Sequence, residues 1–164
     1  MHRMIVLYHS RTGNTEKMAR AVAEGAIAAG AEAVTSRVDG FKAEHLRDYG
    51  AIAIGSPTYY GGMAAEVKKL IDESVRLHGS LDGKIGGAFA SSANVGGGNE
   101  TTVMDILQAM LIHGMVIQGT HVGDHYGPVA VGVPDQRALE GCRALGRRMA
   151  RLMQAVDGRL ASGA

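Results

Sequence analysis

Short apolar runs alternate with longer stretches of helical periodicity along the whole chain. The apolar runs are residues 4–8, 31–38, 51–55, 84–91 and 115–120, and the helical stretches are residues 15–29, 64–77, 103–111 and 136–156, with a short helix expected within 41–49. Strands and helices that alternate in this way favour a parallel sheet with right-handed crossovers. The sequence therefore predicts an α/β fold, a doubly wound five-stranded parallel sheet with helices on both faces.

The predicted topology places three loops together. Five strands in a doubly wound sheet favour the order 2-1-3-4-5, and ligands of such sheets bind beyond the carboxyl ends of the strands. The loops after the first, third and fourth strands should therefore meet at one edge. A chain of 164 residues has the size of one domain, and no linker or repeat divides it, so residues 1–164 are expected to form a single domain.

Composition and charge exclude several classes of partner. The formal net charge is +1, without a basic cluster before the last helix, so nucleic acid is not an expected partner. The apolar run at residues 4–8 is too short for the core of a signal peptide, and no run is long enough to cross a membrane. The single cysteine, Cys142, fits a reducing compartment. The sequence predicts a cytoplasmic protein without membrane insertion.

The loop between the first strand and the first helix is rich in groups that bind anions. Residues 8–15 read YHSRTGNT, and the start of the following helix presents free backbone N–H groups to this loop. It is neither a Walker A sequence nor a Gly-x-Gly-x-x-Gly fingerprint. The candidate phosphate-binding residues are Ser10, Arg11, Thr12, Gly13, Asn14 and Thr15. The alternative is that Asn14 or Thr15 simply caps the helix.

The loop after the third strand has the residue types that a flat aromatic ligand needs. Proline stiffens the turn, a tyrosine can stack on a ring, and two glycines keep the backbone free of side chains. The alternative is a glycine turn with two surface tyrosines. The candidate cofactor-binding residues here are Pro57, Thr58, Tyr59, Tyr60, Gly61 and Gly62.

The loop after the fourth strand offers backbone N–H groups and little bulk. These properties suit the polar edge of a ring, although a flexible connector would have the same composition. The candidate cofactor-binding residues are Ser91, Ser92, Ala93, Asn94, Val95, Gly96 and Gly97.

Several segments resemble known flavoproteins. Residues 10–15, SRTGNT, resemble the flavodoxin loop that binds the phosphate of FMN. Between residue 3 and about residue 153, the chain resembles the WrbA family of FMN-dependent NAD(P)H:quinone oxidoreductases, above all in GSPTYYGGMAAEVKKLID, GGGNETTVMDILQAMLIHGMVIQG and GDHYGP. The resemblance implies a flavodoxin-like fold with FMN, its phosphate held by residues 10–15, and residues 57–62 and 91–97 on either side of the isoalloxazine ring.

The same resemblance implies a role for His113 and raises the question of assembly. His113 falls where the family has a histidine that approaches the flavin of a neighbouring subunit, so it is a possible catalytic residue acting in trans. The alternative is a histidine that caps the end of the fourth helix, before Gly114. The segments 38–49 and 121–126 are shorter than in WrbA proteins, where insertions shape the tetramer. The sequence therefore allows a homo-oligomer, either a dimer or a tetramer.

Two functions compete at this point. The first is an FMN oxidoreductase that takes electrons from NAD(P)H and passes two of them to a quinone-like small-molecule acceptor. The second is a flavodoxin-type electron carrier that docks on a redox protein, and a flavin-binding scaffold is a third. The near-neutral charge departs from the strongly acidic small carriers and suits an anionic nicotinamide. No metal site is expected, because His121 and His125 lie in a loop and Cys142 lies in an apolar helical stripe.

Overall fold

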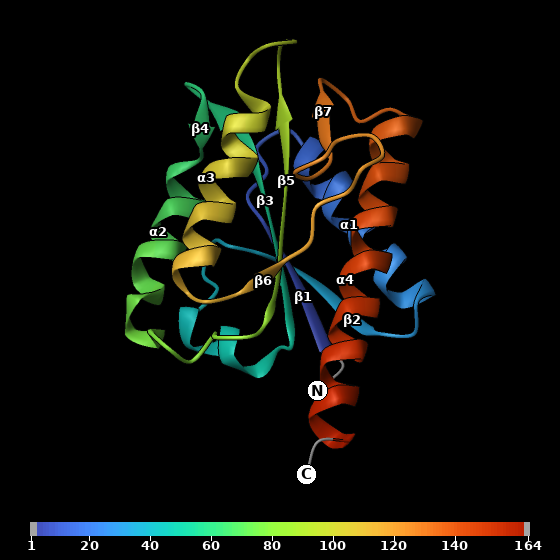
Figure 1. The fold of residues 1–164 in the computed structure, drawn as a ribbon. Helices are drawn as coiled ribbons and strands as arrows, with labels where there is room; N and C mark the ends of the chain where they lie inside the picture. Colours follow the sequence, from blue (N-terminus) through green and yellow to red (C-terminus); the bar gives the residue numbers. More distant parts are fainter. Residues whose placement is uncertain (1–2, 163–164) are drawn as a thin grey trace.

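The structure, a computed structural model, describes residues 3–162 as one sheet between two layers of helices (Figure 1). The strands are β1 (Arg3–Tyr8), β2 (Glu32–Arg37), β3 (Ala51–Tyr59), β4 (Gly62–Met63), β5 (Ile85–Ser92), β6 (Val116–Ile117) and β7 (Val129–Val131). The helices are α1 (Asn14–Ala28), the 3-10 helix η1 (Ala43–Asp48), α2 (Ala65–Glu73), the 3-10 helix η2 (Ser74–Leu77), α3 (Asn99–Ile112) and α4 (Gln136–Ser162).

The sheet confirms the parallel, doubly wound prediction but not the number of strands. The main path runs β2-β1-β3-β5-β6, with all pairs parallel, so the chain visits the sheet in the predicted succession. The prediction of five strands is wrong, because the described sheet has seven. The expected strand 115–120 is shortened to β6, which pairs with the start of β5. An additional strand outside that range, β7, pairs with the end of β5. The third strand also extends past residue 55, its predicted end, and its last residues pair with β4 in antiparallel orientation.

Two apolar cores fill the space between the sheet and its helices. Alternate residues of β1 face opposite ways, so that Val6 packs beneath α1 and α4 whereas Leu7 packs beneath α2 and α3. A glycine of α1, Gly25, lies against α4. A Cβ atom at Gly25 would lie 2.0 Å from the backbone oxygen of Arg143. Small residues therefore set the distance between α1 and α4.

The turn between β3 and β4 is a tight two-residue hairpin. Tyr59 pairs with Gly62, and the two residues between them, Tyr60 and Gly61, have φ angles of 50° and 82°. Two positive φ angles are typical of a type I′ turn. The turn directs the Tyr60 side chain fully into solvent.

Among the helices of residues 3–162, none combines the length and apolar character that crossing a membrane requires.

Candidate functional site

The three predicted loops meet at the carboxyl edge of the sheet, the upper edge in Figure 1. Thr15, at the start of α1, and Ser91, at the end of β5, are both buried, and their hydroxyl oxygens lie 2.9 Å apart in a hydrogen bond. The second and third loops approach through their backbones, because a Cβ atom at Gly98 would lie 2.6 Å from Cα of Gly61. The fold therefore brings together residues that are far apart in the sequence.

The first loop leaves the start of α1 without a side-chain cap. The N-cap residue is Gly13, in the left-handed conformation at φ 89°, and no side chain bonds to the first turn as a cap. Asn14 and Thr15 lie inside the helix, so the alternative that one of them caps it is wrong. The unpaired N–H groups of a helix start attract anions. This end of α1 is therefore suited to a phosphate.

The remaining side chains of the first loop add donors around that helix start. Ser10 is buried, and its Oγ accepts a hydrogen bond of 3.1 Å from the N–H of Gly13, which leaves its own O–H group available to donate. Arg11 and Thr12 are exposed at the outside of the loop. No carboxylate occurs between residues 9 and 15. The donor set thus matches a phosphate group.

The second loop is held by the first turn of α3. Thr102 Oγ1 lies 3.0 Å from Thr58 Oγ1, and Thr101 Oγ1 donates to the backbone oxygen of Gly61 at 2.6 Å. Tyr59 is partly exposed beside the fully exposed Tyr60. Pro57, Thr58, Gly61 and Gly62 are half-buried. These contacts fix the backbone of the loop and leave both tyrosine rings accessible.

The third loop has a buried base and an exposed tip. Ser91 and Ser92 are buried at the end of β5. Ser92 Oγ donates to the backbone oxygen of Asn94 at 3.0 Å and accepts a hydrogen bond of 3.1 Å from the amide of Asn99. The tip consists of exposed residues, which are Ala93, Asn94, Val95, Gly96 and Gly97. The ordered base and small tip leave room for a ligand beside the loop.

His113 lies at the opposite edge of the sheet from these loops. It follows the last turn of α3, whose 14 residues span about 20 Å. Ser74 Oγ donates to the backbone oxygen of Ile71 at 2.6 Å, so it must accept the hydrogen bond of 2.8 Å from His113 Nε2. Burial, and then the nearby His78, lower the pKa of His113, which favours the neutral ring. His113 is thus the C-cap residue of α3, and its side chain bonds to Ser74, far from the three loops of the same chain.

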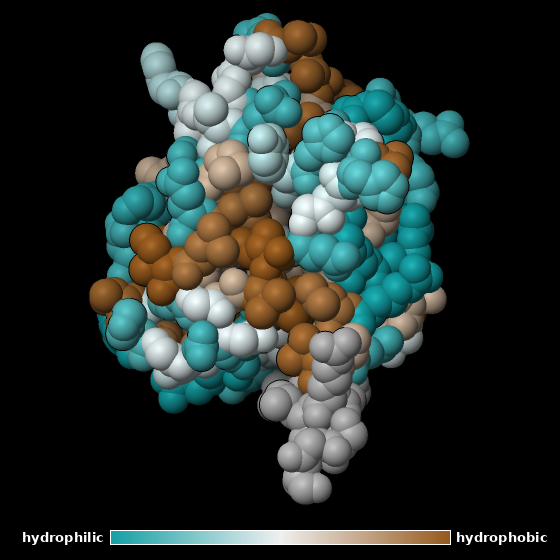
Figure 2. All heavy atoms as spheres, viewed as in Figure 1, coloured by the Kyte–Doolittle hydropathy of each residue, from teal (hydrophilic) through white to brown (hydrophobic). Residues whose placement is uncertain are grey.

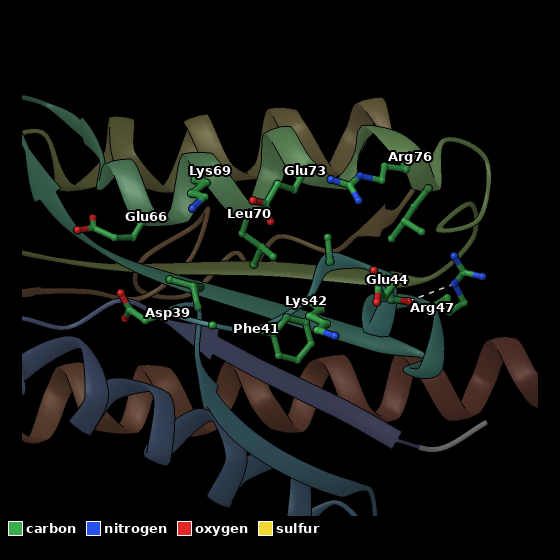
Figure 3. A pocket seen from close by; sticks show the side chains of 14 residues that line it. Asp39, Phe41, Lys42, Glu44, Arg47, Glu66, Lys69, Leu70, Glu73 and Arg76 are labelled. Carbon is green, nitrogen blue, oxygen red and sulfur yellow. Dashed lines mark hydrogen bonds between the residues drawn. The ribbon is translucent and has the colours of Figure 1, made fainter.

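Sequence reasoning missed a group of charged residues behind the first loop. His9 is buried between Asp39, which follows β2, and Glu66, in the first turn of α2. A hollow of about 700 Å³ opens from Asp39 and Glu66 along α2 (Figure 3). None of the predicted cofactor-binding residues lines it. Cys142, by contrast, is a core residue as predicted, and burial raises the pKa of its thiol to about 12.

A mainly parallel α/β sheet whose first helix starts uncapped, at a glycine in a loop of hydroxyl residues, is the architecture of the flavodoxin-like class of proteins. The flavodoxin domain family matches residues 5–105, and the chain belongs to this family.

Proteins similar to this chain carry two kinds of name. An Archaeoglobus fulgidus protein named NAD(P)H dehydrogenase (quinone) is 35% identical, over 94% of this chain and 98% of its own length. An Aquifex aeolicus protein named Flavodoxin is 41% identical, over 97% of this chain and 91% of its own length. The crystal structure of a WrbA-like flavodoxin from Agrobacterium tumefaciens superposes with a TM-score of 0.81 at 29% identity, covering 94% of this chain and 99% of that one. The expected resemblance to WrbA-type proteins is confirmed.

Proposed function

We propose that this chain binds FMN and acts as an NAD(P)H-dependent oxidoreductase that passes two electrons to a quinone-like acceptor. The observation that carries the proposal is the uncapped start of α1 at Gly13, surrounded by hydroxyl groups and free of carboxylates. The names of relatives that match nearly the whole chain support the choice of reductant and acceptor. Bound FMN would supply the redox chemistry, and the protein supplies position and electrostatics.

Each loop has a separate task in this proposal. Residues 10–15 hold the phosphate through the N–H groups of α1 and the hydroxyl groups beside them. Residues 57–62 flank one side of the isoalloxazine ring, where Tyr59 is free to stack, and residues 91–97 line the other side with backbone groups. The hydrogen bond between Thr15 and Ser91 joins the phosphate end to the ring end. The spacing between the two ends is therefore fixed before the ligand binds.

A steady-state assay tests the proposed reaction. The FMN-loaded protein is mixed with NADH or NADPH, with and without a soluble quinone, and oxidation of the nicotinamide is followed. We expect oxidation that depends on the quinone. The second candidate is an electron carrier, favoured by the similarity to the protein named Flavodoxin. A carrier would accept electrons from a chemical reductant or a redox protein and would show no quinone-dependent oxidation of either nucleotide.

Removing single hydroxyl groups tests the phosphate loop. Thr12→Ala and Thr15→Ala should each weaken FMN binding by about 1 to 3 kcal/mol, because a hydrogen bond to a charged group is lost. Thr35→Ala is the matched control, since Thr35 is an exposed threonine on β2. A fluorescence titration with FMN measures all three variants. Affinities equal to that of the wild type would remove the phosphate role from these two threonines.

We also propose that the chain forms a homo-oligomer through an apolar band near the end of α3. Figure 2 shows an apolar band across the face that α3 and β6 share. Leu111, Ile112 and Val116 are exposed there, and β6 ends the main path of strands. Exposed apolar groups beside an edge strand favour association with another chain. His113 follows Ile112 directly, so an interface here places it against the partner, as a contact in trans requires.

A charge placed in the band tests this assembly. We expect the wild type to sediment as a dimer or tetramer and Ile112→Glu to shift it to a smaller species, because a carboxylate would be buried without a partner. Ile27→Glu is the control, since Ile27 is a similarly exposed isoleucine on α1. Analytical ultracentrifugation measures all three proteins. A monomeric wild type, or an Ile112→Glu protein of unchanged mass, would contradict the proposed interface.

A further inference from the structure

His9 is a buried histidine whose two ring nitrogens both face carboxylates. The residue is 8% exposed. Nδ1 lies 3.4 Å from Asp39 Oδ2, without making a hydrogen bond, and Nε2 lies 3.7 Å from Glu66 Oε2. A neutral imidazole has one donor and one acceptor nitrogen, whereas an ionised carboxylate only accepts. Only the imidazolium form can donate to both neighbours.

The same group of residues contacts the backbone of the phosphate loop. Arg37, at the end of β2, pairs with Asp39 Oδ2 at 3.1 Å through Nε and Nη2. Its Nη2 also donates to the backbone oxygen of Ser10 at 3.0 Å. Asp39 thus contacts both His9 and Arg37. His9 directly precedes Ser10 in the chain, and Arg37 forms a hydrogen bond with the backbone of Ser10. A change of charge at His9 therefore changes the electrostatic potential directly behind the proposed phosphate site.

The hollow of Figure 3 borders the two carboxylate neighbours of this buried ring. Asp39 and Glu66 project from opposite walls at the same end of the hollow. Their side chains are 43% and 45% exposed, whereas the His9 side chain is 10% exposed. Lys69, a turn further along α2, and Lys42, on the other wall, also line the hollow. The two carboxylate neighbours of His9 are therefore open to solvent, whereas the imidazole ring is nearly enclosed.

We propose that His9 is a positioning residue whose protonation, between Asp39 and Glu66, raises the affinity of the adjacent loop for the phosphate of FMN. With the imidazolium present, the His9, Arg37, Asp39 and Glu66 group is neutral. When His9 loses its proton, these four residues carry a net charge of −1 behind a site for a phosphate dianion. That charge repels the ligand. Because binding effects are reciprocal, FMN must in turn favour uptake of a proton.

A pH series of binding measurements tests the proposal, which rests on FMN binding at this loop. Dissociation constants are measured for FMN and for riboflavin, which lacks the phosphate, with wild type and with His9→Asn. For wild type, the ratio of FMN to riboflavin affinity should fall with rising pH relative to His9→Asn, by at most about tenfold per pH unit, the limit for one proton. The phosphate's own second ionisation, at about pH 6, acts equally on both proteins.

Two further variants complete the test. His45→Asn is the matched control, since His45 makes the same 3.4 Å contact with Asp48 but in solvent, and it should retain the wild-type profile. Should His9→Asn fail to fold, Glu66→Gln replaces it, and the fall in affinity should then begin at lower pH. Coinciding FMN profiles of wild type and His9→Asn, or an unmoved profile of Glu66→Gln, would overturn this inference alone. Absence of FMN binding at every pH would overturn the proposed function.

Discussion

Gly146→Ala is expected to destabilise the fold by about 3 kcal/mol, although alanine favours helix over glycine by about 1 kcal/mol. A Cβ atom at Gly146, on α4, would lie 1.9 Å from the backbone oxygen of Val22 and 2.8 Å from the backbone nitrogen of Ala26, both on α1. Backbone atoms cannot rotate away as a side chain can, so the two helices would have to separate along their contact. Urea unfolding gives the free energy of unfolding of variant and wild type.

Gly141 provides the control for this expectation within the same helix. A Cβ atom there would meet only Cβ of Pro128, at 3.3 Å. Gly141→Ala should therefore stay within about 1 kcal/mol of the wild type, because the gain in helix propensity offsets a small adjustment. Equal stability of Gly146→Ala and Gly141→Ala would show that the glycine contact between α1 and α4 does not limit how closely they pack.

Thr12→Asp is expected to weaken FMN binding about 100-fold, close to 3 kcal/mol, while riboflavin binding changes little. Thr12 is exposed in the loop before α1, so the new carboxylate leaves the core untouched. It places a negative charge beside the group that the uncapped helix start is proposed to hold. Thr35→Asp makes the same change on β2 and should bind FMN like the wild type. Titrations of each protein with both flavins measure the effect.

The comparison between the two flavins decides how a loss is interpreted. Equal losses for FMN and riboflavin would mean that the substitution disturbs the ring or the fold rather than the phosphate. Unchanged FMN binding by Thr12→Asp would place the phosphate away from residues 10–15.

The fold could be predicted because its strands are buried and its helices are periodic. Residues 51–55 are apolar without a break, as a central parallel strand requires, and all five lie in β3. The shortness of β6 and the presence of β7 could not be predicted from the same signal. β6 and β7 have two and three residues, and both pair with β5, which is a long-range contact that local periodicity does not report.

The arrangement of the site was predictable only in part. The loops after β1, β3 and β5 converge because parallel strands end at one edge, and this follows from the order of strands alone. The sequence predicted free N–H groups at the start of α1 but left a capped start open as the alternative, because Asn14 and Thr15 both favour a capping position. The positive φ of Gly13 moves the helix start by one residue and so places both side chains within the first turn.

The charged group around His9 had a weak signal in the sequence. His9 follows β1 and Asp39 follows β2, so the predicted pairing of these strands puts both residues at the same edge. The helix that carries Glu66 follows the third strand, and nothing in its own periodicity indicates that this carboxylate faces His9. A buried histidine between two carboxylates is therefore visible only in three dimensions.

Anaerobic addition of NADH, and separately NADPH, to the FMN-loaded protein is the most direct test of the proposed oxidoreductase. The visible absorbance of the flavin is followed after each addition. We predict rapid loss of this absorbance with at least one of the two nucleotides and its return when a quinone is added. Absorbance that stays constant with both nucleotides, and is lost only with a chemical reductant, would contradict the proposed reaction and favour an electron carrier.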